Sequence, residues 1–77
     1  MEEVLVSIAS GLVQNPEAVK VTVDEPNENG VTVLHLSVAE GDMGRVIGKQ
    51  GRIAKAIRTV MRAAANKADM NIAVEID

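Results

Sequence analysis

The sequence predicts an α+β fold in which helices cover one face of a three-stranded mixed sheet. Three observations lead to this class: helical periodicity near the N-terminus and again over 52–67, two-residue alternation in three short segments, and a helix-containing connection before the last of these segments. At 77 residues, of which 25% are charged, the chain is expected to form a single folded domain over 1–77.

The first helix is expected over 3–14. Its apolar residues follow the spacing of one helical face, and Pro16 stops the helix because the residue before a proline avoids the α region. Two half-buried strands are expected next, over 19–23 and 31–38, joined by a polar turn over 24–30. Strands joined by so short a loop should pair antiparallel.

The second half of the chain is expected to hold one or two helical turns over 42–47, a longer helix over 52–67 and a strand over 72–76. A helix between the second and third strands allows these strands to run parallel, with a right-handed connection. The longer helix is predicted to turn an apolar face inward and a basic face outward. The inward residues are Ile53, Ala56, Ile57, Val60, Met61 and Ala64, and the outward ones are Lys55, Arg58 and Arg62.

Charge is unevenly divided along the chain. The net charge is −3, yet seven of the eight basic residues and none of the eleven acidic residues lie within 45–67. This window therefore carries +7, which creates a directed field that attracts anions such as nucleic acids. The alternative is a solvated basic helix that only keeps the protein soluble.

Missing residue types exclude several functions. There is no aromatic residue for base stacking, no cysteine and only one histidine, so no metal or other cofactor is expected. The acidic residues are scattered, and no nucleophile–base pair can be assembled by spacing, so we do not expect an enzyme. The N-terminus does not resemble a secretory signal and no apolar run reaches ~18 residues, which favours a cytoplasmic protein.

A glycine pair marks the start of the longer helix. Gly48 and Gly51 enclose Lys49 and Gln50, whereas an earlier pair, at 41 and 44, encloses an aspartate that would repel phosphate. A helix start attracts anions because its first N–H groups lack partners and its dipole is positive there. Glycines let a sugar–phosphate backbone approach closely, while Lys49 and Arg52 offer charge-assisted contacts. The alternative is a tight turn without a ligand.

Two other phosphate-binding loops do not fit this segment. A Walker loop needs a glycine where Met43 stands and a serine or threonine where Gln50 stands. A dinucleotide-binding loop needs a further glycine where Val46 stands.

The segment Val46-Ile47-Gly48-Lys49-Gln50-Gly51 resembles the V-I-G-x-x-G signature of the K-homology (KH) domain. The α-β-β-α-α-β order resembles the bacterial type II form of this domain. The resemblance implies that the loop grips about four nucleotides of single-stranded RNA, whose bases lie in a groove between the helix pair and a strand edge. It implies groove contacts from Arg45, Val46 and Ile47, backbone contacts from Lys49 and Gln50, and a second wall from 72–76. With Gly48, Gly51, Arg52 and Lys55, these residues form the expected RNA site.

The resemblance also implies a role as an RNA chaperone or post-transcriptional regulator, acting as a homodimer or with a second KH-domain protein. The alternative is a protein-interaction module whose basic face binds an acidic partner, with RNA binding incidental. The two functions differ in competition, because a bound RNA should be displaced by unrelated single strands. A dimer contact is expected at the outward face of the sheet or on a small-residue flank of the longer helix, unless that flank is an ordinary exposed boundary. The flank comprises Ala54, Met61 and Ala65.

Overall fold

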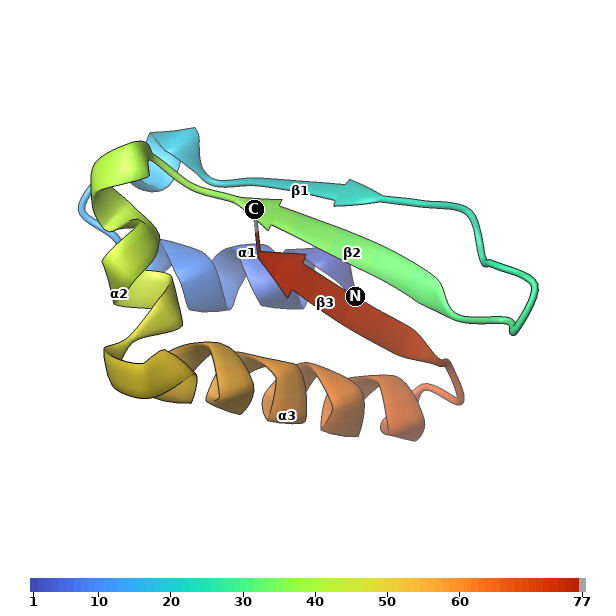
Figure 1. The fold of residues 1–77 in the computed structure, drawn as a ribbon. Helices are drawn as coiled ribbons and strands as arrows, with labels where there is room; N and C mark the ends of the chain where they lie inside the picture. The colour runs from blue at the N-terminus through green and yellow to red at the C-terminus, as the bar shows by residue number, and fades with distance from the viewer. Residues whose placement is uncertain (77) are drawn as a thin grey trace.

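The computed structural model describes residues 1–76 and has the predicted order of elements (Figure 1). Its helices are α1 (Glu2–Ser10), α2 (Met43–Ile47) and α3 (Arg52–Lys67), and its strands are β1 (Lys20–Val23), β2 (Thr32–Ser37) and β3 (Ile72–Ile76). Three short 3₁₀ turns connect them: η1 (Pro16–Ala18), η2 (Glu40–Asp42) and η3 (Lys49–Gly51).

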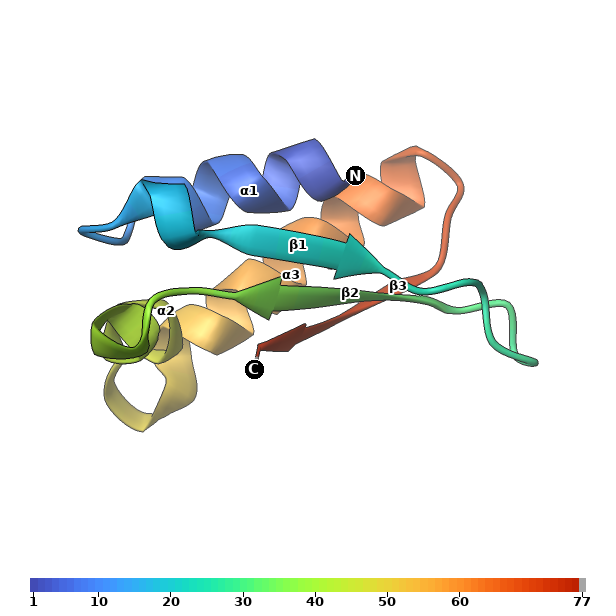
Figure 2. The same ribbon diagram turned by 90° about the horizontal axis from the view of Figure 1, so that it is seen from above.

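The strands form one sheet in the order β1-β2-β3. β1 runs antiparallel to β2, and β3 runs parallel to β2 with Leu34 opposite Val74. Figure 2 shows α1 and α3 on the same side of this sheet, while α2 stands at one end of the molecule. The predicted α+β class is therefore confirmed, and β3 is an edge strand beside α3.

The core is aliphatic and lies between the helices and the sheet. Alternation along β2 turns Leu34 and Leu36 inward, where both are buried. Full burial of such a side chain stabilises the fold by about 1.5–3 kcal/mol. The other members of the core cluster are Leu5 and Ala9 of α1, Val46 of α2, Ile57 and Met61 of α3, and Val74 of β3.

Helix α1 ends at Ser10, four residues before the predicted end at 14. The next residue is Gly11, and glycine weakens a helix by about 1 kcal/mol relative to alanine. The backbone N–H groups of Gln14 and Asn15 donate to the carboxylate of Asp42. The chain must leave the helix to make these contacts, which the apolar periodicity could not indicate.

Helix α3 has the predicted bounds, but its buried face is rotated from the predicted one. Ala56 and Val60 were expected inside and are exposed, with 49% of Val60 accessible. They line an apolar groove that α1 leaves open beside α3, together with Ile8, Leu12, Arg52, Ile53 and Ile57. The buried residues are Ala54, Ile57, Met61 and Ala65. The expectation that Ala54, Met61 and Ala65 form an exposed dimer flank is therefore wrong.

Candidate nucleic-acid interface

The turn between α2 and α3 has a backbone that depends on its two glycines. Gly48 has φ +75° and ψ 176°, and Gly51 has φ +73° and ψ 14°. A Cβ added at Gly48 would lie 2.6 Å from Cγ1 of Ile53, whereas one at Gly51 would meet no atom within 4 Å. Gln50, between them, is also left-handed at φ +58°. Ile53 thus packs over Gly48 and holds the turn against the first residues of α3.

The turn uses some of the N–H groups that were expected to be free for phosphate. The N–H of Gly51 donates to the carbonyl of Gly48 at 3.2 Å, and the N–H of Arg52 donates to the carbonyl of Lys49. Attraction for an anion at this place therefore comes mainly from the exposed cationic side chains of Lys49 and Arg52.

Arg52 is oriented by the turn itself. Its Nη2 donates to Oε1 of Gln50 at 3.2 Å, which keeps the guanidinium beside the turn. Lys55 follows one helical turn later and is exposed. Within residues 1–76, no carboxylate pairs with Lys49, Arg52 or Lys55, so their charges remain available to a ligand.

Arg45 is held by a buried carboxylate at the start of α2. Its Nε lies 3.3 Å from Oδ1 of Asp42, while about half of the Arg45 side chain is exposed. Asp42 is 2% exposed and also accepts hydrogen bonds from the N–H groups of Gln14 and Asn15 and from Nδ2 of Asn15. Burial raises the pKa of Asp42, but these donors and Arg45 outweigh it, so the net shift is downward. This aspartate joins the α1–β1 loop to α2 and does not face a phosphate site.

The two apolar residues expected beside the groove differ in exposure. Ile47 is 38% exposed at the end of α2 and offers its side chain to a ligand. Val46 is fully buried in the core, so the expected groove contact by its side chain is wrong. Its side chain instead fixes α2 against the sheet.

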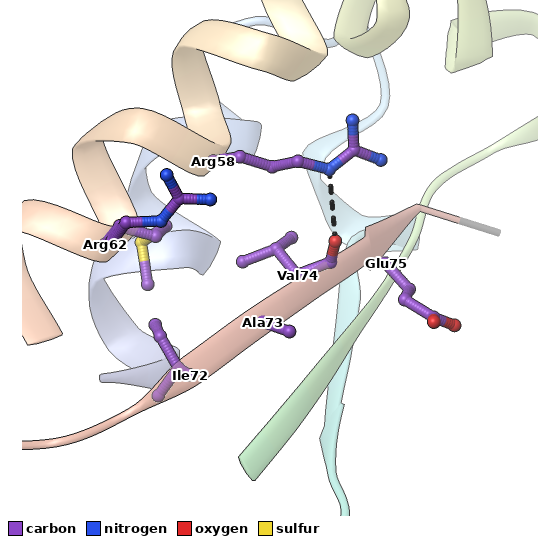
Figure 3. A pocket seen from close by; sticks show the side chains of 7 residues that line it. Arg58, Arg62, Ile72, Ala73, Val74 and Glu75 are labelled. Atoms are coloured by element: carbon purple, nitrogen blue, oxygen red, sulfur yellow. Dashed lines mark hydrogen bonds between the residues drawn. The ribbon is translucent and has the colours of Figure 1, made fainter. Parts of the chain in front are cut away.

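A second hollow lies between α3 and β3 (Figure 3). Arg58 was expected to point outward, but its Nε donates to the carbonyl of Val74 at 3.2 Å. Arg62 lies beside it, whereas the Glu75 side chain points away, with Oε2 3.7 Å from Nδ1 of His35. This hollow has a volume of about 330 Å³ and is lined by Arg58, Met61, Arg62, Ile72, Ala73, Val74 and Glu75.

The expected groove included 72–76, but the two arginines opposite, Arg58 and Arg62, were expected on the outward face of the helix. Arg58 lies four residues after Ala54, so both share one flank of α3. That spacing would have placed Arg58 beside β3, had the buried face been centred on Ala54 and Met61.

Within the described residues, no helix could cross a membrane and no cluster of acidic or histidine side chains could hold a metal ion.

The α-β-β-α-α-β fold with a glycine turn between its two adjacent helices defines a KH domain. Comparison with known families gives the more particular assignment: the family "KhpA/KhpB, KH domain" matches residues 2–76, and the chain belongs to this family.

Named relatives match almost end to end. The chain is 51% identical over 76 residues to the RNA-binding protein KhpA of Listeria monocytogenes, covering 99% of this chain and 97% of that protein. It is 50% identical to the RNA-binding protein KhpA of Caldanaerobacter subterraneus, covering 99% of each. Among solved structures, Era of Aquifex aeolicus aligns with a TM-score of 0.65 and 20% identity. That match covers 96% of this chain and 28% of the Era chain, and it shows the fold alone.

Proposed function

We propose that this chain binds single-stranded RNA, with the turn at 48–51 gripping the sugar–phosphate backbone. The observation that carries the proposal is the exposed turn at which Gly51 leaves open space for a strand and Lys49 and Arg52 have no carboxylate partner within residues 1–76. The names of the relatives, RNA-binding protein KhpA, support the same ligand.

The bases of the bound strand would lie in the hollow between α3 and β3. Arg45, Ile47, Gly48 and Gly51 border the strand, Lys49, Gln50, Arg52 and Lys55 contact its phosphates, and Val46 acts only by supporting α2. Phosphate contacts of this kind position a strand without reading its sequence. Because no aromatic residue is present, bases would rest on aliphatic side chains.

The test is the double variant Lys49→Asp with Gln50→Asp. Two carboxylates at the turn replace attraction with repulsion, so RNA affinity should fall below detection in fluorescence anisotropy with a labelled single-stranded RNA. Both side chains are exposed, so thermal unfolding should stay close to that of the unaltered protein. Unchanged affinity in the folded double variant would refute the role of the turn.

The proposed biological role is that of an RNA chaperone or post-transcriptional regulator in the cytoplasm, with 1–77 as a single KH domain. One such site contacts few nucleotides, so a second linked site raises the effective concentration of the strand. We therefore propose that the chain works as a homodimer or with a second KH-domain protein. The apolar groove between α1 and α3 suits this contact, because it gathers Ile8, Leu12, Ile53, Ala56 and Val60 on one surface.

A further inference from the structure

The guanidinium of Arg58 has a fixed position at the hollow between α3 and β3. Nε of Arg58 is engaged by the carbonyl of Val74, and no acceptor within residues 1–76 takes its two terminal nitrogens. The backbone contact limits the rotation of the side chain, so less conformational entropy is lost when the terminal nitrogens bind a ligand. Arg58 therefore presents a preorganised pair of donors to whatever enters the hollow.

The walls of the hollow suit a flat, partly apolar ligand that offers hydrogen-bond acceptors. Met61, Ile72 and Val74 supply aliphatic surface, and Arg62 adds a second cation. The carboxylate of Glu75 points away from the hollow, beside His35 on the outer face of the sheet. Among the lining residues no side-chain acceptor points inward, and the backbone carbonyl of Val74 already accepts from Arg58, so the guanidinium of Arg58 dominates the hydrogen-bond preference of the hollow. The volume of about 330 Å³ is at the small end of ligand sites, which suits one base rather than several.

Of the four RNA bases, guanine matches this donor arrangement best. Its N7 and O6 are adjacent acceptors, and they form the commonest specific pairing with an arginine fork. Adenine places a donor beside N7, and uracil places a donor between its two carbonyl groups, so each would leave a guanidinium arm facing a donor. Cytosine has adjacent acceptors but a smaller ring, and it would bury less area against the aliphatic walls.

We infer that Arg58 reads a guanine in the hollow between α3 and β3, so that the domain favours single strands carrying a guanine next to the nucleotides gripped by the turn. This inference rests on the proposed RNA-binding function. The distance along α3 agrees with it: Arg58 lies seven residues beyond Gly51, about 10 Å at the helical rise of ~1.5 Å per residue. A base whose phosphate lies at the turn can reach that far into the hollow.

The experiment uses fluorescein-labelled RNA octamers: an all-uridine strand and strands with a single guanosine, cytidine or adenosine at each internal position. Anisotropy titrations with the full chain should give about tenfold tighter binding for the best guanosine strand than for the all-uridine strand. Arg58→Lys keeps the charge but removes the fork, so it should cut this advantage to below about twofold. The matched control, Arg62→Lys in the same hollow, should leave the advantage intact.

Several outcomes would overturn the inference. A preference that survives Arg58→Lys, or a best strand that carries cytidine or adenosine, contradicts guanine reading by Arg58. Equal weakening of all strands by Arg58→Lys, together with a shallower dependence of affinity on salt in Arg58→Ala, would instead mean a phosphate contact. Tight binding that does not depend on the base would refute this inference and leave the proposed RNA-binding function standing. If the unaltered protein binds none of the RNA strands, both the inference and the proposed function are refuted.

A second measurement avoids any variant. Amide NMR spectra of the unaltered protein are compared after addition of the all-uridine octamer or the best guanosine octamer. The inference expects the Nε–H signal of Arg58 and the amide signal of Val74 to shift further with the guanosine strand. Shifts of equal size with both strands would count against a base contact in the hollow.

Discussion

Replacing Gly48 with alanine should be far more damaging than the same change at Gly51, although both glycines belong to one turn. At Gly48, φ +75° with ψ 176° is a region that only glycine adopts readily, and forcing a side chain there costs on the order of 1–3 kcal/mol. The new Cβ would also lie 2.6–2.9 Å from three side-chain carbons of Ile53. Relieving such overpacking costs about 1–3 kcal/mol more, so the total is about 2–6 kcal/mol.

Gly51→Ala and Gly44→Ala provide matched controls. Gly51 is left-handed at φ +73°, but an added Cβ meets nothing within 4 Å, so its cost should be only about 1–2 kcal/mol. Gly44 lies inside α2, without a positive φ and with no neighbour within 4 Å of an added Cβ. Gly44→Ala should therefore stabilise the protein by about 0.5–1 kcal/mol.

The assay is urea unfolding followed by far-UV circular dichroism, which gives the free energy of unfolding of each variant. Gly48→Ala is also measured in an Ile53→Ala background, which removes the contacts with Cγ1 and Cδ1 of Ile53 and leaves the backbone strain and the 2.9 Å contact with Cβ. Its cost should then fall by about 1 kcal/mol or more, a coupling typical of residues in contact. Equal costs for Gly48→Ala and Gly51→Ala, with no relief in the Ile53→Ala background, would refute the reasoning.

Three further outcomes are expected. Because the pKa of Asp42 is lowered in the folded state, its contribution to stability is complete above the unfolded-state pKa and is lost as the pH falls below about 4. The melting temperature should therefore depend on pH more steeply in the unaltered protein than in Asp42→Asn. Identical profiles of melting temperature against pH would contradict this expectation. Arg52→Ala should weaken RNA binding by on the order of 1–2 kcal/mol, but Arg62→Ala by only a few tenths, in anisotropy titrations at two salt concentrations. Equal losses would mean that the hollow beside Arg62 contributes as much to affinity as the turn, contrary to the proposal. Val60→Lys should leave folding intact, since Val60 is 49% exposed, yet shift sedimentation at high micromolar concentration from dimer to monomer; a dimer that persists would exclude the groove between α1 and α3.

The sequence predicted the element order, the strand pairing and the bounds of α3, because each depends on local pattern. Alternation in 31–38 and 72–76 and the helical period of 52–67 are strong signals read without tertiary information. The end of α1 was missed because a distant carboxylate, Asp42, draws residues 14 and 15 out of the helix. A contact between segments so far apart along the chain has no local signature.

The site was predicted unevenly for the same reason. The glycine turn and its cations form a contiguous motif, and the structure places Lys49, Gln50 and Arg52 together on an exposed turn. The burial of Val46 and the orientation of the Arg58 side chain toward β3 depend on how α2 and α3 are rotated against the sheet. On α3 the small residues Ala54 and Ala65 are buried against the rest of the fold, and Val60 is exposed. A buried face predicted from hydrophobicity alone is drawn toward Val60, because valine is bulkier and more apolar than alanine.

The buried Asp42 has a consequence for the order in which the molecule assembles. Helix α2 has five residues, too few to persist by itself, since nucleating a helix costs more than its first hydrogen bonds return. Its first residues are fixed by contacts from Asp42 to chain segments 27 and 28 residues earlier. Such distant contacts form only after the intervening strands have brought both segments together. The glycine turn at the end of α2 should therefore acquire its final shape late in folding and be among the first parts of the chain to open.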